Sequence, residues 1–168
     1  DITANGTIVT KTTLDRESQS FYTFQVEVTD HELQSDQKTA TCVVQVAVSD
    51  VNDEVPVFES PNFARILENS PANTLITTMR AYDRDSGENA NIEYLLEDSE
   101  LGKFTIGRID GVLRSVVPLD REDREVYKLA VIAVDSGSPR MTSRVDVTVT
   151  VVDMNDNTPE FNPKHYSA

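Results

Sequence analysis

Hydrophobic and polar side chains alternate one by one along three stretches of the chain, which is the pattern of a β-strand with one buried face. Phe24, Val26 and Val28 alternate with polar residues, and residues 42–48 and 145–151 continue the same period of two. β-branched residues are frequent in these stretches, which favours strands. No window shows a sustained apolar period of 3.6 residues, so the chain is predicted to be all-β.

Turn signals divide the later part of the chain into short candidate strands. Asn5-Gly6 and Asp110-Gly111 predict hairpin turns, because both residues of each pair tolerate a positive φ. The predicted strands cover residues 57–66, 74–82, 92–96, 104–106, 112–116, 126–134 and 144–152. Seven short alternating strands predict a seven-stranded Greek-key β-sandwich of the immunoglobulin-like kind.

The chain also contains an internal repeat, which indicates tandem structural units. The motif Leu-Asp-Arg-Glu begins at Leu14 and again 105 residues later at Leu119. The motif Asp-x-Asn-Asp begins at Asp50 and again 103 residues later at Asp153. The chain is therefore expected to open in the middle of a unit, as an internal piece of a longer mature protein. The expected organisation is the second half of a unit at 1–50, a linker at 51–55, a complete unit at 56–152, a second linker at 153–159 and the start of a following unit at 160–168.

The charge and the cysteine content exclude several kinds of partner and of stabilising link. The 168 residues carry a formal charge of −14, with 29 acidic and 15 basic side chains, which argues against nucleic acid as a partner. The longest apolar run, residues 129–134, is far shorter than the roughly 20 residues of a membrane-spanning helix. The single cysteine, Cys42, excludes an intrachain disulfide and is expected to be a buried, inert thiol. Bound metal is another way to stabilise such a domain.

The acidic residues gather where predicted strands end. Successive strands of a sandwich end at opposite poles, so strand order sorts the acids into two sets. Asp83, Asp85 and Asp135 are expected at the upstream pole of the complete unit, beside the linker 50–54. The downstream pole is expected to hold Glu68, Asp120, Glu122 and Asp153.

Stacking two units would bring Asp15 and Glu17 of the first unit against the upstream acids of the second. Two like charges about 4 Å apart cost roughly 4 kcal/mol at an effective dielectric near 20, so cations are needed to hold the units together. Calcium, which takes six to eight oxygen ligands, suits such a site. Arg16, Arg84 and Arg121 are expected to point away and not to neutralise it.

These motifs together resemble the calcium motifs of cadherin repeats. The matching stretches are Leu-Asp-Arg-Glu, Asp-x-Asn-Asp-x-x-Pro-x-Phe, Asp-x-Asp-Ser-Gly-Glu-Asn-Ala and Leu-Glu-Asn-Ser-Pro, and the resemblance covers essentially the whole chain. It is most like long non-classical cadherins of the protocadherin, Fat and Dachsous kind. The resemblance implies calcium-dependent cell–cell adhesion by extracellular repeats of a plasma-membrane protein. The implied partner is another cadherin ectodomain, homophilic or heterophilic, and neither enzymatic activity, nor a small-molecule substrate, nor nucleic acid is expected.

The resemblance also implies which residues hold calcium, with up to three ions at the 50–54 junction. The ion nearest the first unit would be held by Asp15, Glu17 and Asp53. The middle ion would be held by Glu17, Asp50, Asp53, Asp85 and the carbonyl of Val51. The third would be held by the Asn52 side chain, Asp83, Asp85, Asp135 and the carbonyls of Glu54 and Asn89. If a following repeat is present, a second junction would use Glu68, Asp120, Glu122, Asp153, Met154, Asn155, Asp156 and Asn157.

Other interpretations stay open at this point. A calcium-independent sandwich of a receptor ectodomain could bind a protein through its sheet face, as fibronectin type III modules do. A hydrolase is disfavoured, because the chain has neither Gly-x-Ser-x-Gly nor His-Glu-x-x-His. Asn5-Gly6-Thr7 is a glycosylation sequon as well as a turn. The expected core includes Tyr82, Tyr94 and Tyr127, with Phe58 and Phe161 closing one end of each sandwich.

Overall fold

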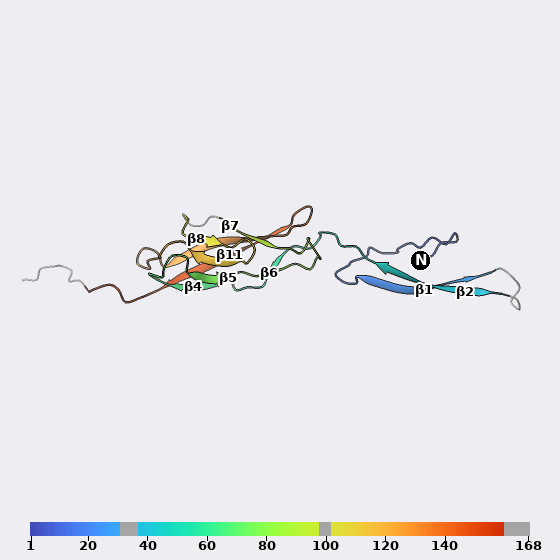
Figure 1. Ribbon diagram of the computed structural model, residues 1–168, viewed down its shortest axis with the longest axis horizontal. Coiled ribbons are helices and arrows are strands. Elements are labelled where there is room, and N and C mark those ends of the chain that lie inside the picture. Colours follow the sequence, from blue (N-terminus) through green and yellow to red (C-terminus); the bar gives the residue numbers. More distant parts are fainter. Residues whose placement is uncertain (31–36, 98–101, 160–168) are drawn as a thin grey trace, which may run out of the picture.

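The computed structural model of the protein describes residues 1–30, 37–97 and 102–159. All regular structure in these ranges is β-strand, which confirms the predicted all-β class. The described chain is elongated, with a two-stranded hairpin towards one end and a sandwich towards the other (Figure 1). The hairpin consists of β1 (Phe21–Thr29) and β2 (Thr39–Ala47), which pair antiparallel.

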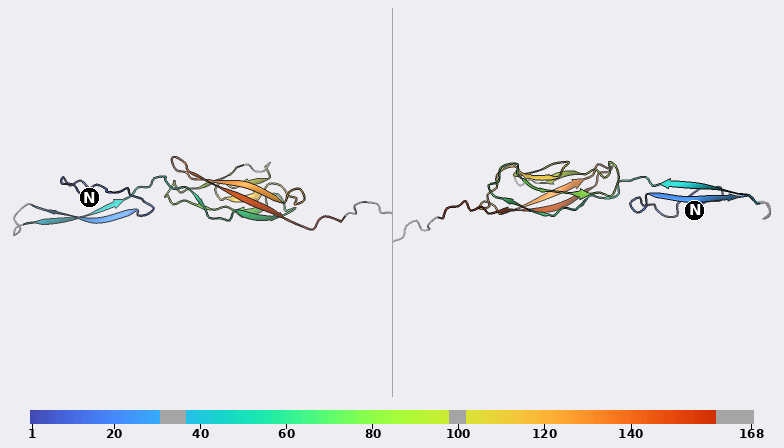
Figure 2. Two further views of the ribbon diagram at one scale, coloured as in Figure 1. Left: turned by 180° about the vertical axis from the view of Figure 1, so that it is seen from behind. Right: turned by 60° about the horizontal axis from the view of Figure 1, so that its bottom comes forward.

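The sandwich is built from two layers of strands (Figure 2). One layer is a four-stranded sheet in the order β4 (Phe63–Leu67), β11 (Thr142–Val152), β10 (Val126–Val134) and β7 (Glu93–Glu97). The other holds a three-stranded sheet in the order β5 (Leu75–Thr78), β9 (Val112–Ser115) and β8 (Phe104–Ile106). A short pair, β3 (Val57–Phe58) with β6 (Ala81–Tyr82), forms a separate two-stranded sheet. Only β4 and β11 pair in parallel among these strands.

The core lies between the two layers and follows the period of two in β10 and β11. Tyr127, Leu129 and Val131 of β10 are almost fully buried, and so are Val147, Val149 and Val151 of β11. The ring of Phe104 meets Tyr127 edge to face at a centroid distance of 5.1 Å, a favourable aromatic geometry.

Two of the three tyrosines predicted for the core lie there. Tyr94 and Tyr127 are buried, whereas Tyr82 is 57% exposed, so that prediction is wrong. In the two-residue strand β6, alternation turns Ala81 towards the core and leaves Tyr82 outside. Phe58 packs against the core and lies 6.4 Å from Tyr94 between ring centroids, while Phe161 falls outside the described residues.

The predicted strands 57–66 and 74–82 each divide in two, because the chain changes sheet within them. β3 pairs with β6, whereas β4 pairs with β11. Pro61 lies in the connection, where a residue without a backbone N–H does not interrupt a ladder. Between β5 and β6, the backbone N–H of Met79 donates instead to the carbonyl of Gly111 at 2.8 Å.

The internal repeat is visible in the pairing of the strands. Phe21 is opposite Ala47 in the hairpin, and Val126 is opposite Thr150 in the sandwich. These partners are offset by 105 and 103 residues, so the two antiparallel pairs share one register. Cys42 is exposed, which contradicts the prediction of a buried thiol. Its counterpart Val145 packs against the core, but no second sheet covers the hairpin within the described ranges.

Candidate metal centre

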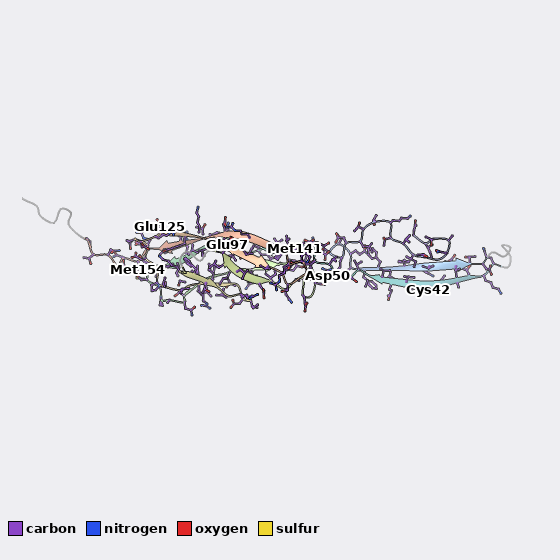
Figure 3. All side chains as sticks on the ribbon, turned by 90° about the horizontal axis from the view of Figure 1, so that it is seen from above. Cys42, Asp50, Glu97, Glu125, Met141 and Met154 are labelled. Atoms are coloured by element: carbon purple, nitrogen blue, oxygen red, sulfur yellow. The ribbon has the colours of Figure 1, made fainter. Side chains whose placement is uncertain are left out.

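The linker after β2 lies between the hairpin and the sandwich, with Asp50 close to both (Figure 3). Pro56, which is buried, follows the linker and leads into β3. Before β1, the chain turns at Asp15, whose carbonyl accepts the N–H of Gln19 at 2.9 Å. This turn places Glu17 beside the linker residue Asp53. The site therefore draws on three segments: the turn before β1, the linker, and the loops at the upstream pole of the sandwich.

One acidic cluster joins all three segments. Glu17, Asp53 and Asp85 each offer a carboxylate oxygen, and these oxygens lie within 4.8 Å of one another. Glu17 belongs to the first unit, Asp53 to the linker and Asp85 to the sandwich. A single cation at this point would contact both units and their connection.

The sandwich side of the site consists of buried carboxylates. Asp83, Asp85 and Asp135 are 3%, 6% and 0% exposed. Asp83 accepts the N–H of Asp85 at 2.9 Å, and Asp135 accepts the N–H groups of Gly137 and Met141, both at 3.0 Å. Such bonds hold the loops in place but leave the negative charge uncompensated, which is costly away from water.

Several buried oxygens have no hydrogen-bond partner within the described part of the chain. They include Asn52 Oδ1, Asp83 Oδ2 and Asp85 Oδ1. The Asn52 amide is oriented by its other end, since Nδ2 donates to Asp135 at 3.0 Å and to the carbonyl of Pro139 at 2.6 Å. Unpartnered oxygens of this kind are the ligands that calcium takes, so the donor set fits that ion.

The electrostatics of Asp85 agree with this assignment. Burial raises the pKa of its carboxyl group, and the charges of Asp83, Asp50 and Glu17 raise it further, while the N–H of Glu54 opposes the shift. Asp50 behaves differently. Burial raises its pKa, but hydrogen bonds from Ser86 and Asn89, together with the charge of Arg16, lower it, and the net shift is downward.

Arg16 lies inside the junction, which contradicts the prediction that it points away. Its guanidinium forms ion pairs with Glu17 and Asp50, and Nη2 also donates to the carbonyl of Arg84 at 2.8 Å. Arg84 contacts Glu54 at 3.3 Å. The physical reason is that the guanidinium fork matches carboxylates well, and Arg16 is adjacent in sequence to the cluster.

Of the residues predicted for this junction, Asp15 lies outside the cluster of Glu17, Asp53 and Asp85. Asp15 is exposed, and its two oxygens accept the N–H and the hydroxyl of Ser18 at 3.2 and 2.7 Å. The side chain of Asn89 donates to Asp50 at 2.9 Å. Val51 is 65% exposed, and its predicted ligand is the backbone carbonyl, which stays a prediction, as does that of Asn89.

A second acidic cluster occupies the downstream pole. Glu68, Glu122 and Asp153 offer oxygens within 4.8 Å of one another, and Glu68 is 1% exposed. The N–H groups of Met154 and Arg121 donate to Glu68 and lower its pKa. Arg121 pairs with Asp153 at 3.1 Å and Glu122 at 3.2 Å, so its predicted outward orientation is also wrong.

The remaining predicted residues of this pole lie around that cluster. Asp120 accepts the N–H of Glu122 at 2.9 Å and so shapes its own turn. Asp156 accepts from Asn69 at 2.5 Å and from Asn157 at 3.0 Å. Asn155 is exposed. Asn69 was not predicted as a partner of the linker, although its φ of 57° marks it as a special position.

Known proteins resemble this chain over most of its length. The sequence profile of the cadherin domain family matches residues 2–48 and 62–152. Protocadherin Fat 4 of Homo sapiens is 44% identical over 158 residues, which cover 94% of this chain and 3% of that protein. The protocadherin-like wing polarity protein stan of Drosophila melanogaster is 41% identical over 159 residues, covering 93% of this chain and 4% of that protein. The chain thus spans a few per cent of the length of these curated relatives.

Solved structures show the same architecture. The extracellular cadherin domains 3–6 of protocadherin gamma B2 superpose with a TM-score of 0.84 at 29% identity, covering 90% of this chain and 37% of that one. Mouse cadherin-23 EC22–24 superposes with a TM-score of 0.78 at 31% identity, covering 85% of this chain and 45% of that one. In the described residues we find no helix of the length and apolarity needed to cross a membrane.

Proposed function

This chain belongs to the cadherin family, and on that premise we propose that calcium binds at the 50–54 junction and holds the two units in an extended arrangement that serves cell–cell adhesion. The family consists of adhesion modules and not of enzymes. The observation that carries the proposal is the set of buried, unpartnered oxygens of Asn52, Asp83 and Asp85, which lies next to carboxylates from the first unit.

Each of the proposed calcium ions would be held by a different set of residues. Glu17, Asp53 and Asp85 would share an ion that bridges both units, with Asp50 and the carbonyl of Val51 completing its shell. Asn52, Asp83 and Asp135 would hold a second ion on the sandwich side, with the carbonyls of Glu54 and Asn89. Asp15, with Glu17 and Asp53, would hold a third towards the first unit. When bound, calcium supplies positive charge that offsets the repulsion among these carboxylates.

The downstream linker is proposed to form an equivalent site with a following repeat. Glu68, Glu122 and Asp153 already offer oxygens close together. Asp120, Met154, Asn155, Asp156 and Asn157 would contribute side chains or carbonyls once a further unit faces them. The domain limits at 1–50, 56–152 and 160–168 belong to the same proposal.

Binding would stabilise the junction by linkage. A ligand that binds only the ordered state contributes RT ln(1 + [Ca]/Kd), which is about 1.4 kcal/mol per ion at tenfold saturation. Extracellular modules bind calcium with dissociation constants of about 0.1–1 mM. The junction would therefore be ordered at extracellular calcium and loose where calcium is scarce.

The setting of the parent protein is also inferred. The solved relatives are described as extracellular cadherin domains, and one is described as a cis-dimer of protocadherin gammaB7 EC3–6, at 30% identity and a TM-score of 0.85. We infer that this chain is part of the extracellular region of a plasma-membrane protein and that its partner is another cadherin ectodomain.

Isothermal titration with calcium tests the proposal. The wild-type chain should release or absorb heat with saturable binding in the millimolar range or tighter, and Asp53→Ala should weaken binding at least tenfold. Asp146→Asn is the matched control, because Asp146 is an exposed acid on β11 outside both clusters. A calcium-independent sandwich that binds a protein through its sheet face would give no saturable heat, and that result would reject the proposal.

A further inference from the structure

We propose that Asn5 is an N-glycosylation site, with its glycan placed at the pole of the first unit that is remote from the calcium junction. The inference rests on the extracellular setting of the proposed function, because the modification takes place in the secretory route. It does not depend on calcium binding, so the two can be tested separately.

The local geometry presents the Asn5 amide group at a turn. Gly6 has a φ of 82°, and its N–H donates to the carbonyl of Thr3 at 2.9 Å. The Asn5 Oδ1 atom accepts the N–H of Thr7 at 3.2 Å and also the hydroxyl of Thr3. Asn5 is exposed, and its Nδ2 atom makes no hydrogen bond to any other residue in the described ranges. The nucleophilic end of the side chain is thus left free while the oxygen end is held.

The complete unit provides an internal control for this turn. Gly111, which is 105 residues after Gly6, has a φ of 63°, and the N–H of Val112 donates to Asp110 Oδ1 at 3.2 Å. The contact is the same as the one between Thr7 and Asn5. Asp110 is exposed although its sandwich is complete. The exposure of Asn5 therefore follows from its place on the turn and not from the open face of the hairpin.

The same correspondence places the glycan away from calcium. In the complete unit, Arg108 next to the turn pairs with Glu93 at 2.7 Å, and Glu93 also contacts Arg140 in the β10–β11 loop, at 3.4 Å. This loop belongs to the upstream pole with Asp135. By the repeat, Asn5 lies at the upstream pole of the first unit, whereas Glu17 and Asp50 lie at its downstream pole. In Figure 1 the first residues run beside the hairpin, away from the linker.

The modification is a group transfer from a lipid-linked oligosaccharide pyrophosphate, catalysed by an oligosaccharyltransferase. A bond forms between Asn5 Nδ2 and the anomeric carbon of the first sugar. The bond from that carbon to the pyrophosphate oxygen breaks, and the lipid pyrophosphate leaves with the electron pair. Nδ2 loses one proton, which the solvent takes up. Thr7 supplies the hydroxyl that completes the Asn-x-Thr sequon.

The test is secretion of the chain from a eukaryotic cell behind a cleavable signal, followed by mass spectrometry before and after digestion with peptide-N-glycosidase. The wild type should lose the mass of one N-glycan and carry aspartate at position 5 afterwards. Asn5→Gln and Thr7→Val should lose this mass shift completely, whereas Thr7→Ser, which keeps a sequon, should retain it. Cell lysate is assayed alongside the medium, so that a retained chain is also scored.

A gain-of-site variant makes the test sharper. Asp110→Asn combined with Val112→Thr copies the sequon into the matching turn, and should add a second glycan. Calcium titration of the glycosylated chain and of Asn5→Gln should give dissociation constants that agree within twofold. Wild-type chain without glycan in both medium and lysate would overturn the proposal. Glycosylated chain that fails to bind calcium would instead reject the proposed function and leave the glycosylation site standing.

Discussion

Asp85 is 6% exposed, and its pKa is raised first by burial and then by the charges of Asp83, Asp50 and Glu17. If the proposed calcium site is correct, a carboxylate in this position would destabilise the metal-free junction and would become favourable once the ion is bound. The same residue should thus act in opposite directions with and without calcium. An effect of Asp85 on stability that changes sign with calcium would distinguish a calcium site from an ordinary acidic surface.

Asp85→Asn should lower the melting temperature in calcium and raise it in EDTA, each relative to the wild type. The asparagine keeps an oxygen that can accept from the N–H of Glu54, at 3.3 Å in the wild type, and removes only the charge. A change of about 1 kcal/mol would shift the midpoint by roughly 4–8 °C for a domain of this size. Differential scanning calorimetry measures both arms, with Asp146→Asn as the control. Equal destabilisation in both buffers would indicate a purely structural role.

At the residue scale, the sequence predicts the positions of the acidic residues more accurately than the orientations of Arg16 and Tyr82. Strand order was sufficient to bring Asp83 and Asp85 to the pole that faces Glu17, because the end of a strand determines its pole. The orientation of Arg16 depends on competition among nearby charges and could not be obtained in that way. Tyr82 was misplaced because a two-residue strand is too short for alternation to be recognised in sequence.

At the scale of elements, the β8–β9 hairpin depends on Gly111. Its φ is 63°, and a Cβ atom at this position would lie 2.3 Å from the carbonyl oxygen of Met79. That oxygen belongs to the backbone, so the clash cannot be relieved by a rotamer change. The turn is thus specified both by conformation and by the close approach of the segment between β5 and β6.

Gly111→Ala should therefore destabilise the sandwich more than Gly102→Ala. Gly102 also has a positive φ, of 76°, but a Cβ there would meet no atom of the described residues within 4 Å. The left-handed conformation alone costs an alanine about 1–2 kcal/mol, and Gly111→Ala should exceed this by at least about 1 kcal/mol. Urea unfolding in EDTA measures the difference. Equal losses in the two variants would show that the close contact contributes nothing.

Glu93 of β7 forms ion pairs with Arg108 and with Arg140, which lie in two neighbouring segments. Its hydrogen bond from Arg108 lowers its pKa below the ordinary value of 4.5, with smaller contributions from Arg140. A depressed folded pKa means that the contribution to stability is present above about pH 4.5 and is lost as the pH falls through the folded value. The contribution should be constant near neutral pH.

Glu93→Gln should therefore be less stable than the wild type at pH 7, and the difference should shrink as the pH falls below about 4.5 and through the lowered folded pKa of Glu93. The control is Glu97→Gln. Glu97 pairs with Arg144 at 2.8 Å, but both side chains are 54% exposed, so this ion pair should contribute little to stability. Thermal melts across pH in EDTA keep calcium out of the comparison. A difference that grows on acidification would show that the ionised Glu93 carboxylate does not stabilise the folded state.

Element positions were largely predictable, but changes of sheet were not. Strands 104–106 and 126–134 match β8 and β10 in full, because turns or polar loops bound them on both sides. The run 57–66 reads as continuous, yet β3 and β4 belong to different sheets. Pairing partners are set by tertiary contacts, and the local pattern carries no information about them. For the same reason, the exposure of Cys42 could not be read from its alternating neighbours.

For the whole molecule, the chelator EDTA should increase the radius of gyration and broaden the distribution of interatomic distances in solution scattering. Without the proposed calcium, Glu17, Asp53 and Asp85 would face one another with their oxygens within 4.8 Å, and repulsion would drive the units apart. The ion pairs of Arg16 offset part of this repulsion, so Arg16→Met should enlarge the effect of EDTA. Identical scattering curves with and without calcium would contradict a metal-held rod.

The parallel pairing of β4 with β11 has a mechanical consequence. β4 precedes the other paired strands of the four-stranded sheet in the chain and β11 is its last strand, and the two run in the same direction over five paired residues. Tension applied between neighbouring cells would draw β4 one way and β11 the other along their common axis. The ladder would then be loaded in shear, with its bonds strained together and not unzipped in turn.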